Sequence, residues 1–137
     1  MLTDQRGAPL AVTLTGANVH DVKACLATLD SIIAPRPQPR PYHRQHLCLD
    51  KGYDSAEIEA GVRQRGYEPH IRRRGEEALD PGSGRRHPAR RWVVERTGSW
   101  LNRFRKLLIR WEKKAENYLA LVHLACCLTV YRLTVLG

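Results

Sequence analysis

The pattern of hydrophobic and polar positions predicts strands and helices that follow one another along the chain. Residues Pro9–Thr15 alternate apolar and polar side chains in the manner of a strand. The turn-forming residues Asp4–Gly7 precede them, so we expect a hairpin whose first strand lies before Met1. Apolar residues then recur at helical spacing over His20–Ile33, with Asn18 as the expected N-cap.

A second group of elements follows the proline-rich segment Pro35–Pro41, which we interpret as a surface connector within one domain. His46–Asp50 is typical of a short buried strand that ends in a carboxylate. Ser55 is placed to cap a helix over Ala56–Arg65, and Tyr67–Ile71 can form another strand. Because strands and helices alternate, the pattern favours an α/β layer fold.

The last part of the chain predicts two further helices. Glu95 and Lys106 lie on the polar face of the first helix, and Asn117–Leu136 is apolar nearly all round, so we expect it to be a buried helix. The apolar face of the first helix recurs at three- and four-residue steps, and we expect Trp100 and Trp111 to lie in the core with the rest of it: Val93, Thr97, Trp100, Phe104, Leu107 or Leu108, and Trp111.

Length and composition indicate one globular domain. The chain has 137 residues, of which 42% are hydrophobic and 27% are charged. Its amino terminus lacks the features of a signal peptide, and its longest apolar run, Tyr118–Tyr131, is shorter than the ~18 residues that suggest a membrane span. We therefore expect a cytoplasmic protein without a membrane partner. Its cysteines lack metal or redox spacing and are expected to be reduced and mostly buried: Cys25, Cys48, Cys126 and Cys127.

Positive charge is concentrated in one half of the chain. The formal net charge is +9, and residues 63–114 carry sixteen Lys and Arg against six Asp and Glu. This asymmetry favours a surface that binds a polyanion such as nucleic acid, while a basic surface kept for solubility is the alternative. Within this half, Arg72–Arg91 is a long segment rich in Arg, Gly and Pro without periodicity, and we expect it to be a basic loop.

Two carboxylates are candidates for metal chemistry. Asp50 ends a predicted strand, and the carboxyl end of a strand is where α/β proteins gather ligands. Glu95 begins a helix inside the basic stretch and could converge with Asp50. Two carboxylates among arginines would suit a divalent cation beside a phosphate. The alternative is structural, with Asp50 capping the Gly52 turn and Glu95 pairing with Arg91 or Ser99.

Several runs resemble the motifs of DDE transposases from bacterial insertion sequences, in particular the insertion sequence five group. Asp50–Asp54 (DKGYD) resembles the second-aspartate motif, and Arg91–Thr97 (RWVVERT) with Trp100–Leu107 (WLNRFRKL) resembles the glutamate helix. Shorter matches lie at Pro9–Val12, Leu14–Asn18, Arg72–Gly75 and Asn117–Tyr131. The resemblance covers essentially the whole chain.

The resemblance implies an incomplete ribonuclease-H-like fold, a mixed sheet with flanking helices and long carboxy-terminal helices. It makes residues 1–137 the carboxy-terminal portion of a catalytic domain. It implies that Asp50 and Glu95 are catalytic and hold Mg²⁺ or Mn²⁺ for two-metal cleavage and transfer of DNA strands. The family's first aspartate lies upstream, and neither Asp4 nor Asp21 lies on a strand. We therefore expect this chain to be inactive without an upstream segment or second reading frame.

The glutamate helix of the family commonly carries Tyr, Arg and Lys at set distances from its acid. Here Arg91 and Glu95 keep the spacing, whereas Pro88 stands at the Tyr position and Asn102 at the Lys position. Lys106 lies one turn further on and could take over a phosphate contact.

The implied partners are DNA, both the element ends and the target, and a second copy of the protein in a functional homodimer. Arg suits phosphate because its planar fork donates two parallel hydrogen bonds. A non-catalytic basic binding module and a decayed, inactive transposase remnant remain as alternatives. The expected DNA-binding residues are Arg72, Arg73, Arg74, Arg91, Arg96, Arg103, Arg105 and Lys106.

Overall fold

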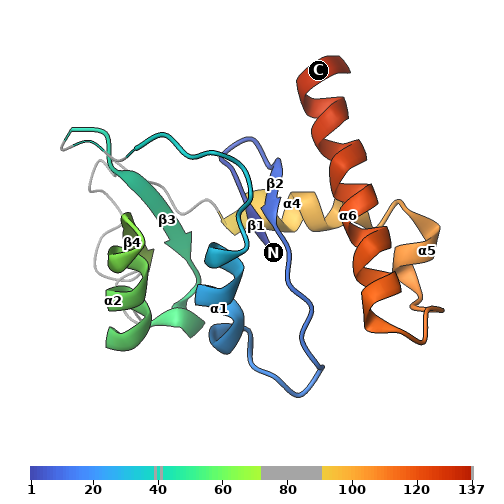
Figure 1. Cartoon of the computed structure of the whole chain (residues 1–137), viewed down its shortest axis with the longest axis horizontal. Helices are drawn as coiled ribbons and strands as arrows, with labels where there is room; N and C mark the ends of the chain where they lie inside the picture. Colours follow the sequence, from blue (N-terminus) through green and yellow to red (C-terminus); the bar gives the residue numbers. More distant parts are fainter. Residues whose placement is uncertain (39, 41, 72–90, 137) are drawn as a thin grey trace. The chain divides into compact units, whose positions relative to one another are not determined.

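The computed structural model describes residues 1–38, 40, 42–71 and 91–136, and Figure 1 shows their elements. The chain divides into two compact units. The first, which we call the hairpin unit, comprises Met1–Ala34 and Trp92–Gly137, and the second, the βαβ unit, comprises Pro35–Arg91. The boundary at Pro35 falls at the start of the proline-rich segment that the sequence pattern indicated as a connector within one domain.

The hairpin unit begins with two short antiparallel strands, β1 (Leu2–Thr3) and β2 (Pro9–Ala11). The expectation that the first strand precedes Met1 is therefore wrong. The predicted turn between them is confirmed, because Asp4 Oδ1 accepts hydrogen bonds from the backbone N–H groups of residues 6 and 8, each at 2.8 Å. Strand β2 ends at Ala11, and the Thr13 hydroxyl instead lies 2.7 Å from that of Thr28.

Helix α1 (Asp21–Asp30) is shorter than the predicted His20–Ile33. It buries Cys25, Thr28 and Leu29, whereas Ile33, the last apolar residue of the predicted period, is exposed. The N-cap is His20, whose side chain makes no capping hydrogen bond, so the expectation of an Asn18 cap is wrong.

The predicted long amphipathic helix is broken into α4 (Arg91–Leu101) and α5 (Arg105–Leu108). Residues 103 and 104 donate their backbone N–H groups to the carbonyls of residues 100 and 101, three positions back. These tighter bonds end the α-helix. Trp100, Phe104 and Leu107 are half-buried on either side of the break, whereas Trp111 is 75% exposed, so its expected place in the core is wrong.

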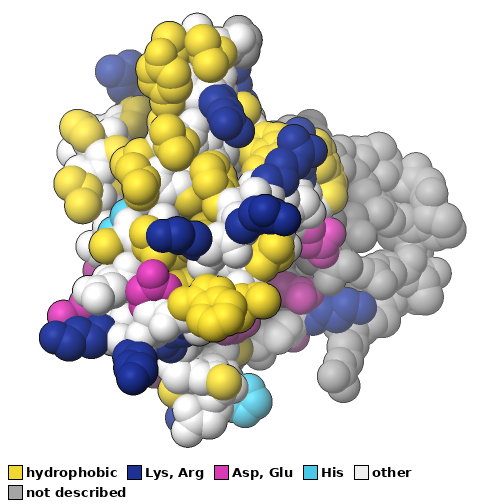
Figure 2. All heavy atoms as spheres, turned by 90° about the vertical axis from the view of Figure 1, so that its right-hand side faces the viewer, with side chains coloured by type: hydrophobic (Ala, Val, Ile, Leu, Met, Phe, Trp, Pro, Cys, Tyr) yellow, Lys and Arg dark blue, Asp and Glu magenta, His cyan; other side chains and the backbone are white. Residues whose placement is uncertain are grey.

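The carboxy-terminal helix α6 (Ala115–Tyr131) continues into a π-helical segment, η2 (Arg132–Leu136). It is not the buried helix that its composition predicts. Val122, Ala125 and Thr129 are buried on one face, while the other face leaves large apolar side chains exposed. Figure 2 faces this side of the molecule and shows hydrophobic side chains interspersed with Lys and Arg. The exposed apolar residues of this helical segment are Leu124, Leu128, Tyr131, Val135 and Leu136.

Residues Ala115–Leu136 form one helical segment of 22 residues that is long and apolar enough, by length and composition alone, to cross a membrane. This segment is longer than the apolar run read from the sequence, because the helix continues through the residues that flank the run. A core helix of a globular protein meets the same criterion, so the finding is weak evidence for a membrane span.

The βαβ unit contains β3 (Gln45–Leu49), the 3₁₀ turn η1 (Lys51–Tyr53), α2 (Ala56–Gln64) and β4 (Tyr67–Ile71). Strands β3 and β4 pair in parallel. The helix begins as predicted, because the Ser55 hydroxyl accepts a hydrogen bond from the backbone N–H of residue 58 at 3.2 Å. It ends at Gln64, one residue earlier than predicted, and Gly66 just beyond it has the expected positive φ of +79°.

The core of the βαβ unit lies between α2 and the sheet. Ile58, Val62 and Leu47 are buried, which confirms the predicted inward face of the helix. Strand β3 is buried on that face only, since His46 and Cys48 are exposed. The mixed α/β class is therefore confirmed. Instead of one mixed sheet, the described residues form two separate two-stranded sheets, one antiparallel and one parallel.

Candidate catalytic acids and nucleic-acid interface

Asp50 directly follows β3 and begins η1. Its Oδ1 accepts a hydrogen bond from the Lys51 backbone N–H at 2.7 Å, so part of the predicted capping role is present. The parallel register sets Leu49 beside Ile71, so both strands end at the same edge of the sheet. Asp50 is exposed at that edge, which is where α/β proteins gather ligands.

Glu95 lies in the first half of α4 with its side chain exposed. The predicted two faces of this helix are confirmed here, because Val93 and Thr97 are buried. The Ser99 hydroxyl donates to the backbone carbonyl of Glu95 at 3.1 Å and not to its carboxylate. The side chain of Arg91, the other structural partner considered, lies outside the described residues. Among the described residues, Glu95 is an exposed carboxylate without a hydrogen-bonded or ion-paired partner.

Asp50 belongs to the βαβ unit and Glu95 to the hairpin unit, so their convergence stays a prediction. Within the described parts of the chain, no three His, Cys, Asp or Glu side chains are grouped so that they could hold a metal ion. The Asp4 carboxylate serves its own turn, and Asp21 lies in the first turn of α1.

Arg96 occupies a position that the sequence pattern did not reveal. Its guanidinium carbon lies 4.7 Å from the centroid of the Trp92 ring and 4.9 Å from that of Trp100. One terminal nitrogen donates to the Arg6 carbonyl at 2.8 Å, and Nε is buried without a partner among the described residues. Arg96 therefore stacks between two rings and fastens α4 to the hairpin turn. The spacing of Trp92, Arg96 and Trp100, four residues apart, is the signal that could have indicated this stack.

Next to Arg96, the Thr97 side chain is fully buried and donates to the Gly7 carbonyl at 2.8 Å. Gly7 has φ +86°, and a Cβ built on it would lie 2.9 Å from Thr97 Oγ1 and 3.2 Å from the Trp100 ring. The turn and the helix thus meet at a distance that only glycine permits.

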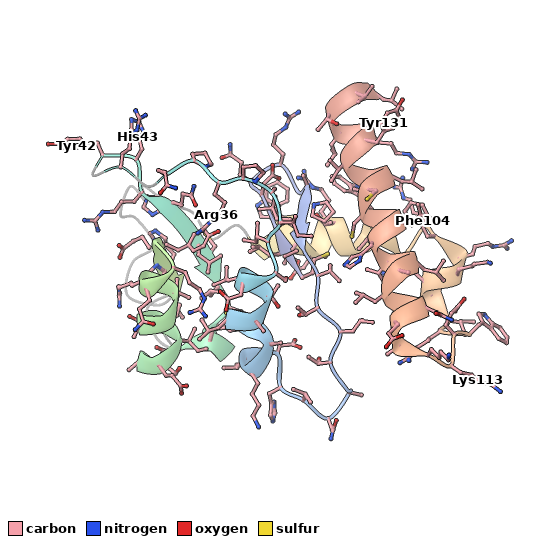
Figure 3. All side chains as sticks on the ribbon, viewed as in Figure 1. Arg36, Tyr42, His43, Phe104, Lys113 and Tyr131 are labelled. Atoms are coloured by element: carbon pink, nitrogen blue, oxygen red, sulfur yellow. The ribbon has the colours of Figure 1, made fainter. Side chains whose placement is uncertain are left out.

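The remaining predicted DNA-binding residues fall into three groups. Arg72, Arg73 and Arg74 lie outside the described residues, as do residues 75–90. Arg103 is exposed in the turn after α4, next to the Phe104 that Figure 3 labels. Lys106 and Arg105 are exposed on α5. Because α4 ends at Leu101, Lys106 does not share a continuous helix face with Glu95, and that expectation is wrong.

Arg36 has a structural role that composition did not single out. It lies in the proline-rich segment, with its guanidinium carbon 4.4 Å from the centroid of the Tyr67 ring. It also donates to the Arg65 carbonyl at 3.2 Å. Figure 3 labels Arg36 beside β3 and β4. This side chain therefore ties the segment to the connection between α2 and β4.

None of the four cysteines, all of them among the described residues, forms a disulfide, and only Cys25 is buried, so the expectation of mostly buried thiols is wrong. Cys126 is half-buried, while Cys48 and Cys127 are exposed. Burial, and to a smaller extent the neighbouring Cys127, raises the pKa of the Cys126 thiol above its usual range.

Comparison with known proteins adds independent information. Residues 1–130 match the family described as "Transposase DDE domain". The chain is 43% identical over 133 residues to the protein assigned as the transposase of insertion sequence element IS402 in Burkholderia cepacia. The aligned region is 93% of this chain and 59% of that protein, so the chain spans well under two thirds of its relative. No solved structure matches this chain.

Proposed function

Because the chain belongs to the family of transposase DDE domains, we propose that it is the carboxy-terminal part of the catalytic domain of an insertion-sequence transposase. The observation that carries this proposal is the family match over residues 1–130, with Asp50 exposed at the carboxyl edge of a parallel strand pair. The insertion sequence five group and a ribonuclease-H-like fold are the finer assignments that the motif order supports.

Asp50 and Glu95 are proposed as two of the catalytic acids. Both side chains are exposed, and each is positioned by a backbone element that the sequence specifies locally, η1 for Asp50 and α4 for Glu95. Carboxylate oxygens are the ligands that Mg²⁺ and Mn²⁺ prefer, so the donor set fits such an ion, although two acids do not complete a site. When bound, the ions activate the attacking hydroxyl and stabilise the leaving oxygen of a phosphodiester.

The basic residues are proposed to bind the DNA backbone at the element ends and the target. Arg72, Arg73 and Arg74 follow β4 directly in the sequence, and β4 ends level with the strand that precedes Asp50. Arg91, Arg103 and Lys106 would extend the contact, whereas Arg96 is engaged with the hairpin turn. Guanidinium groups next to the acids would hold the phosphate and offset its charge.

The complete enzyme is proposed to need residues that this chain does not supply. The chain spans 59% of its relative, and its described acids do not form a three-ligand group. We infer that an upstream segment or second reading frame contributes the first aspartate, that the functional form is a homodimer in the cytoplasm, and that this chain alone does not cut DNA.

Nicking of supercoiled plasmid DNA with Mg²⁺ or Mn²⁺ tests the proposal. The chain is assayed alone and together with the segment encoded upstream of it. We expect nicking only from the combination, and its loss in Asp50→Ala and in Glu95→Ala, with DNA affinity unchanged or slightly higher because a negative charge near the phosphate is gone. The matched controls are Glu57→Ala and Glu116→Ala, which remove exposed acids from other helices and should nick like the wild type.

The remaining outcomes decide among the alternatives. Nicking that survives Asp50→Ala contradicts the assignment of that acid. Nicking by the chain alone would mean that it holds its own third acid, with Asp4 and Asp21 as the residues to test. No nicking in any combination, with salt-sensitive DNA binding retained, would identify a non-catalytic binding module or a decayed remnant.

A further inference from the structure

A pair of histidines lies across the two parallel strands of the βαβ unit. His46 Nδ1 and His70 Nε2 are 2.6 Å apart, and the ring centroids are 4.8 Å apart with the planes inclined at 45°. The residues are separated by 24 positions, so the strand pairing brings them together. One ring nitrogen donates and the other accepts in this contact, so the two nitrogens face each other.

The pair lies on the face of the sheet that is turned away from α2. Side chains alternate along a strand, and the buried Leu47 marks the face that α2 covers. The register sets His46 beside Glu68 and Cys48 beside His70, so these four side chains share the opposite face. His46 is exposed and His70 is half-buried. Solvent therefore reaches two imidazole rings held by two hydrogen-bonded strands.

The carboxylate closest to the pair in the strand register is already ion-paired. Glu68 carries the nearest carboxylate in the register, and two arginines share it: Arg44 Nη1 lies 3.1 Å from Oε2 and Arg63 Nε lies 4.0 Å from Oε1. The carboxylate is thus held in place at the edge of the pair. Neutral imidazole is the commonest side-chain ligand of transition metals.

From this geometry we infer that His46 and His70 form a binding site for a divalent transition-metal ion that prefers imidazole, distinct from the Asp50 and Glu95 acids. Two nitrogens in adjacent positions of a square-planar site with bonds of roughly 2.0 Å are about 2.8 Å apart, and in a tetrahedral site about 3.3 Å. The observed 2.6 Å is a hydrogen-bond length, so the two nitrogens would move slightly apart when an ion replaces the shared proton. Since no third ligand group is assembled among the described residues, water completes the coordination.

The site differs in chemistry from the proposed catalytic centre. Mg²⁺ and Mn²⁺ prefer carboxylate oxygens, whereas nitrogen ligands favour the later transition metals. His46 lies on β3, four residues before the Asp50 that follows this strand, so an ion bound here would sit near the catalytic edge without using its acid. An ion bridging β3 and β4 would also hold the two strands together.

Isothermal titration with NiCl₂ of protein purified without a histidine tag, its thiols kept reduced, tests the site. We expect one Ni²⁺ per chain, and loss of affinity of at least about tenfold in His46→Gln and in His70→Gln, which is the scale of removing a metal partner. The matched control is His123→Gln, because His123 is exposed on α6. Asp50→Ala separates this site from the catalytic one and should bind Ni²⁺ like the wild type.

Equal affinity in the wild type and both histidine variants would overturn the site and leave the contact as a hydrogen-bonded pair. So would an equal loss in His123→Gln or a loss in Asp50→Ala. Because a variant could fail to fold, the wild type with one equivalent of Cu²⁺ is also examined by electron paramagnetic resonance. Coupling to two imidazole nitrogens is expected, and coupling to none or to only one contradicts the pair.

Discussion

Arg96 lies where helix α4 meets the turn of the amino-terminal hairpin. Its guanidinium is stacked between Trp92 and Trp100 and donates to the Arg6 carbonyl. Stacking of this kind is worth about 0.5–2 kcal/mol per ring, and a charged donor to a carbonyl about 1.5–3 kcal/mol. Arg96 follows the proposed catalytic Glu95 directly, so it holds in place the helical turn that carries the acid. A lysine could not replace it, because a point charge lacks the flat face that stacks.

The Cys126 thiol gives a pH-dependent prediction. Its pKa is raised by burial first and by Cys127 second. Thiolate is the form that reacts with iodoacetamide, so the pH midpoint of Cys126 alkylation should lie above that of a model peptide thiol. In a Cys127→Ser variant the midpoint should fall but stay above the peptide value, since burial remains.

The control for Cys126 is the same variant in concentrated guanidinium chloride, where burial is lost and the midpoint should return to the peptide value. The same pKa shift makes the free energy of unfolding depend on pH. The folded state keeps the proton more tightly than the unfolded state, so this thiol's contribution is complete below the unfolded pKa and is lost as pH rises through the folded one. A midpoint for the folded variant at or below that of the peptide would contradict the assignment.

At the scale of elements, the hairpin turn and α4 are fitted to each other through Gly7. The positive φ of this residue and the 2.9 Å approach of its virtual Cβ to Thr97 Oγ1 both exclude a side chain. Gly98, one residue beyond Thr97 on the same helix, has open space around its virtual Cβ. A side chain is therefore excluded at position 7 but has room at position 98.

Gly7→Ala should lower the free energy of unfolding by about 1–3 kcal/mol, because a strained backbone and a close contact are combined. Gly98→Ala should raise it by roughly 0.5–1 kcal/mol, because alanine is the better helix former. Urea unfolding followed by tryptophan fluorescence measures both, since Trp92, Trp100 and Trp111 all belong to the hairpin unit. Equal effects of the two substitutions would contradict this interface.

Helices α4 and α5 show how an apolar stripe can continue through a break in the backbone. The stripe from Val93 to Trp111 predicted one helix, yet the backbone turns at residues 102–104. Tyr118 of α6 then donates its hydroxyl to the Leu107 carbonyl at 3.1 Å and so ties α5 to α6. An unbroken helix would have carried α5 along the line of α4, so the break permits this contact.

On the scale of the whole molecule, charge and its accessibility decide how the protein meets DNA. The excess of basic residues lies in 63–114, but its members differ in availability. Arg103 is exposed, whereas Arg96 is committed to the hairpin turn. The count of arginines therefore overstates the number that can contact phosphate.

Arg103→Ala should weaken DNA binding and reduce the slope of log affinity against log salt concentration by about 0.9, the release of one counterion, with no change in stability. Fluorescence anisotropy of a labelled duplex across a salt series measures the slope. The control is Lys23→Ala, an exposed cation on α1 outside the basic stretch, which should leave the slope unchanged. A slope that stays constant in Arg103→Ala would remove this residue from the interface.

The sequence by itself determined the elements whose causes are local. The cap at Ser55, the inward positions Ile58 and Val62, the stop at Gly66 and the bounds of β4 were all predictable. Each depends on atoms within a few residues of one another: a hydroxyl, a helical period, a residue free to adopt positive φ. The family could also be identified from the order of its motifs, because such an order does not depend on the fold being known.

Only the tertiary structure decided which surfaces meet. Leu2–Thr3 becomes a strand because β2 pairs with it, and His46 meets His70 because β3 and β4 are parallel and in register. The exposed face of α6 and the hydrogen bond from Arg96 to the Arg6 carbonyl likewise depend on partners far away in the chain. Burial and pairing are properties of two surfaces at once, and a periodic pattern specifies only one of them.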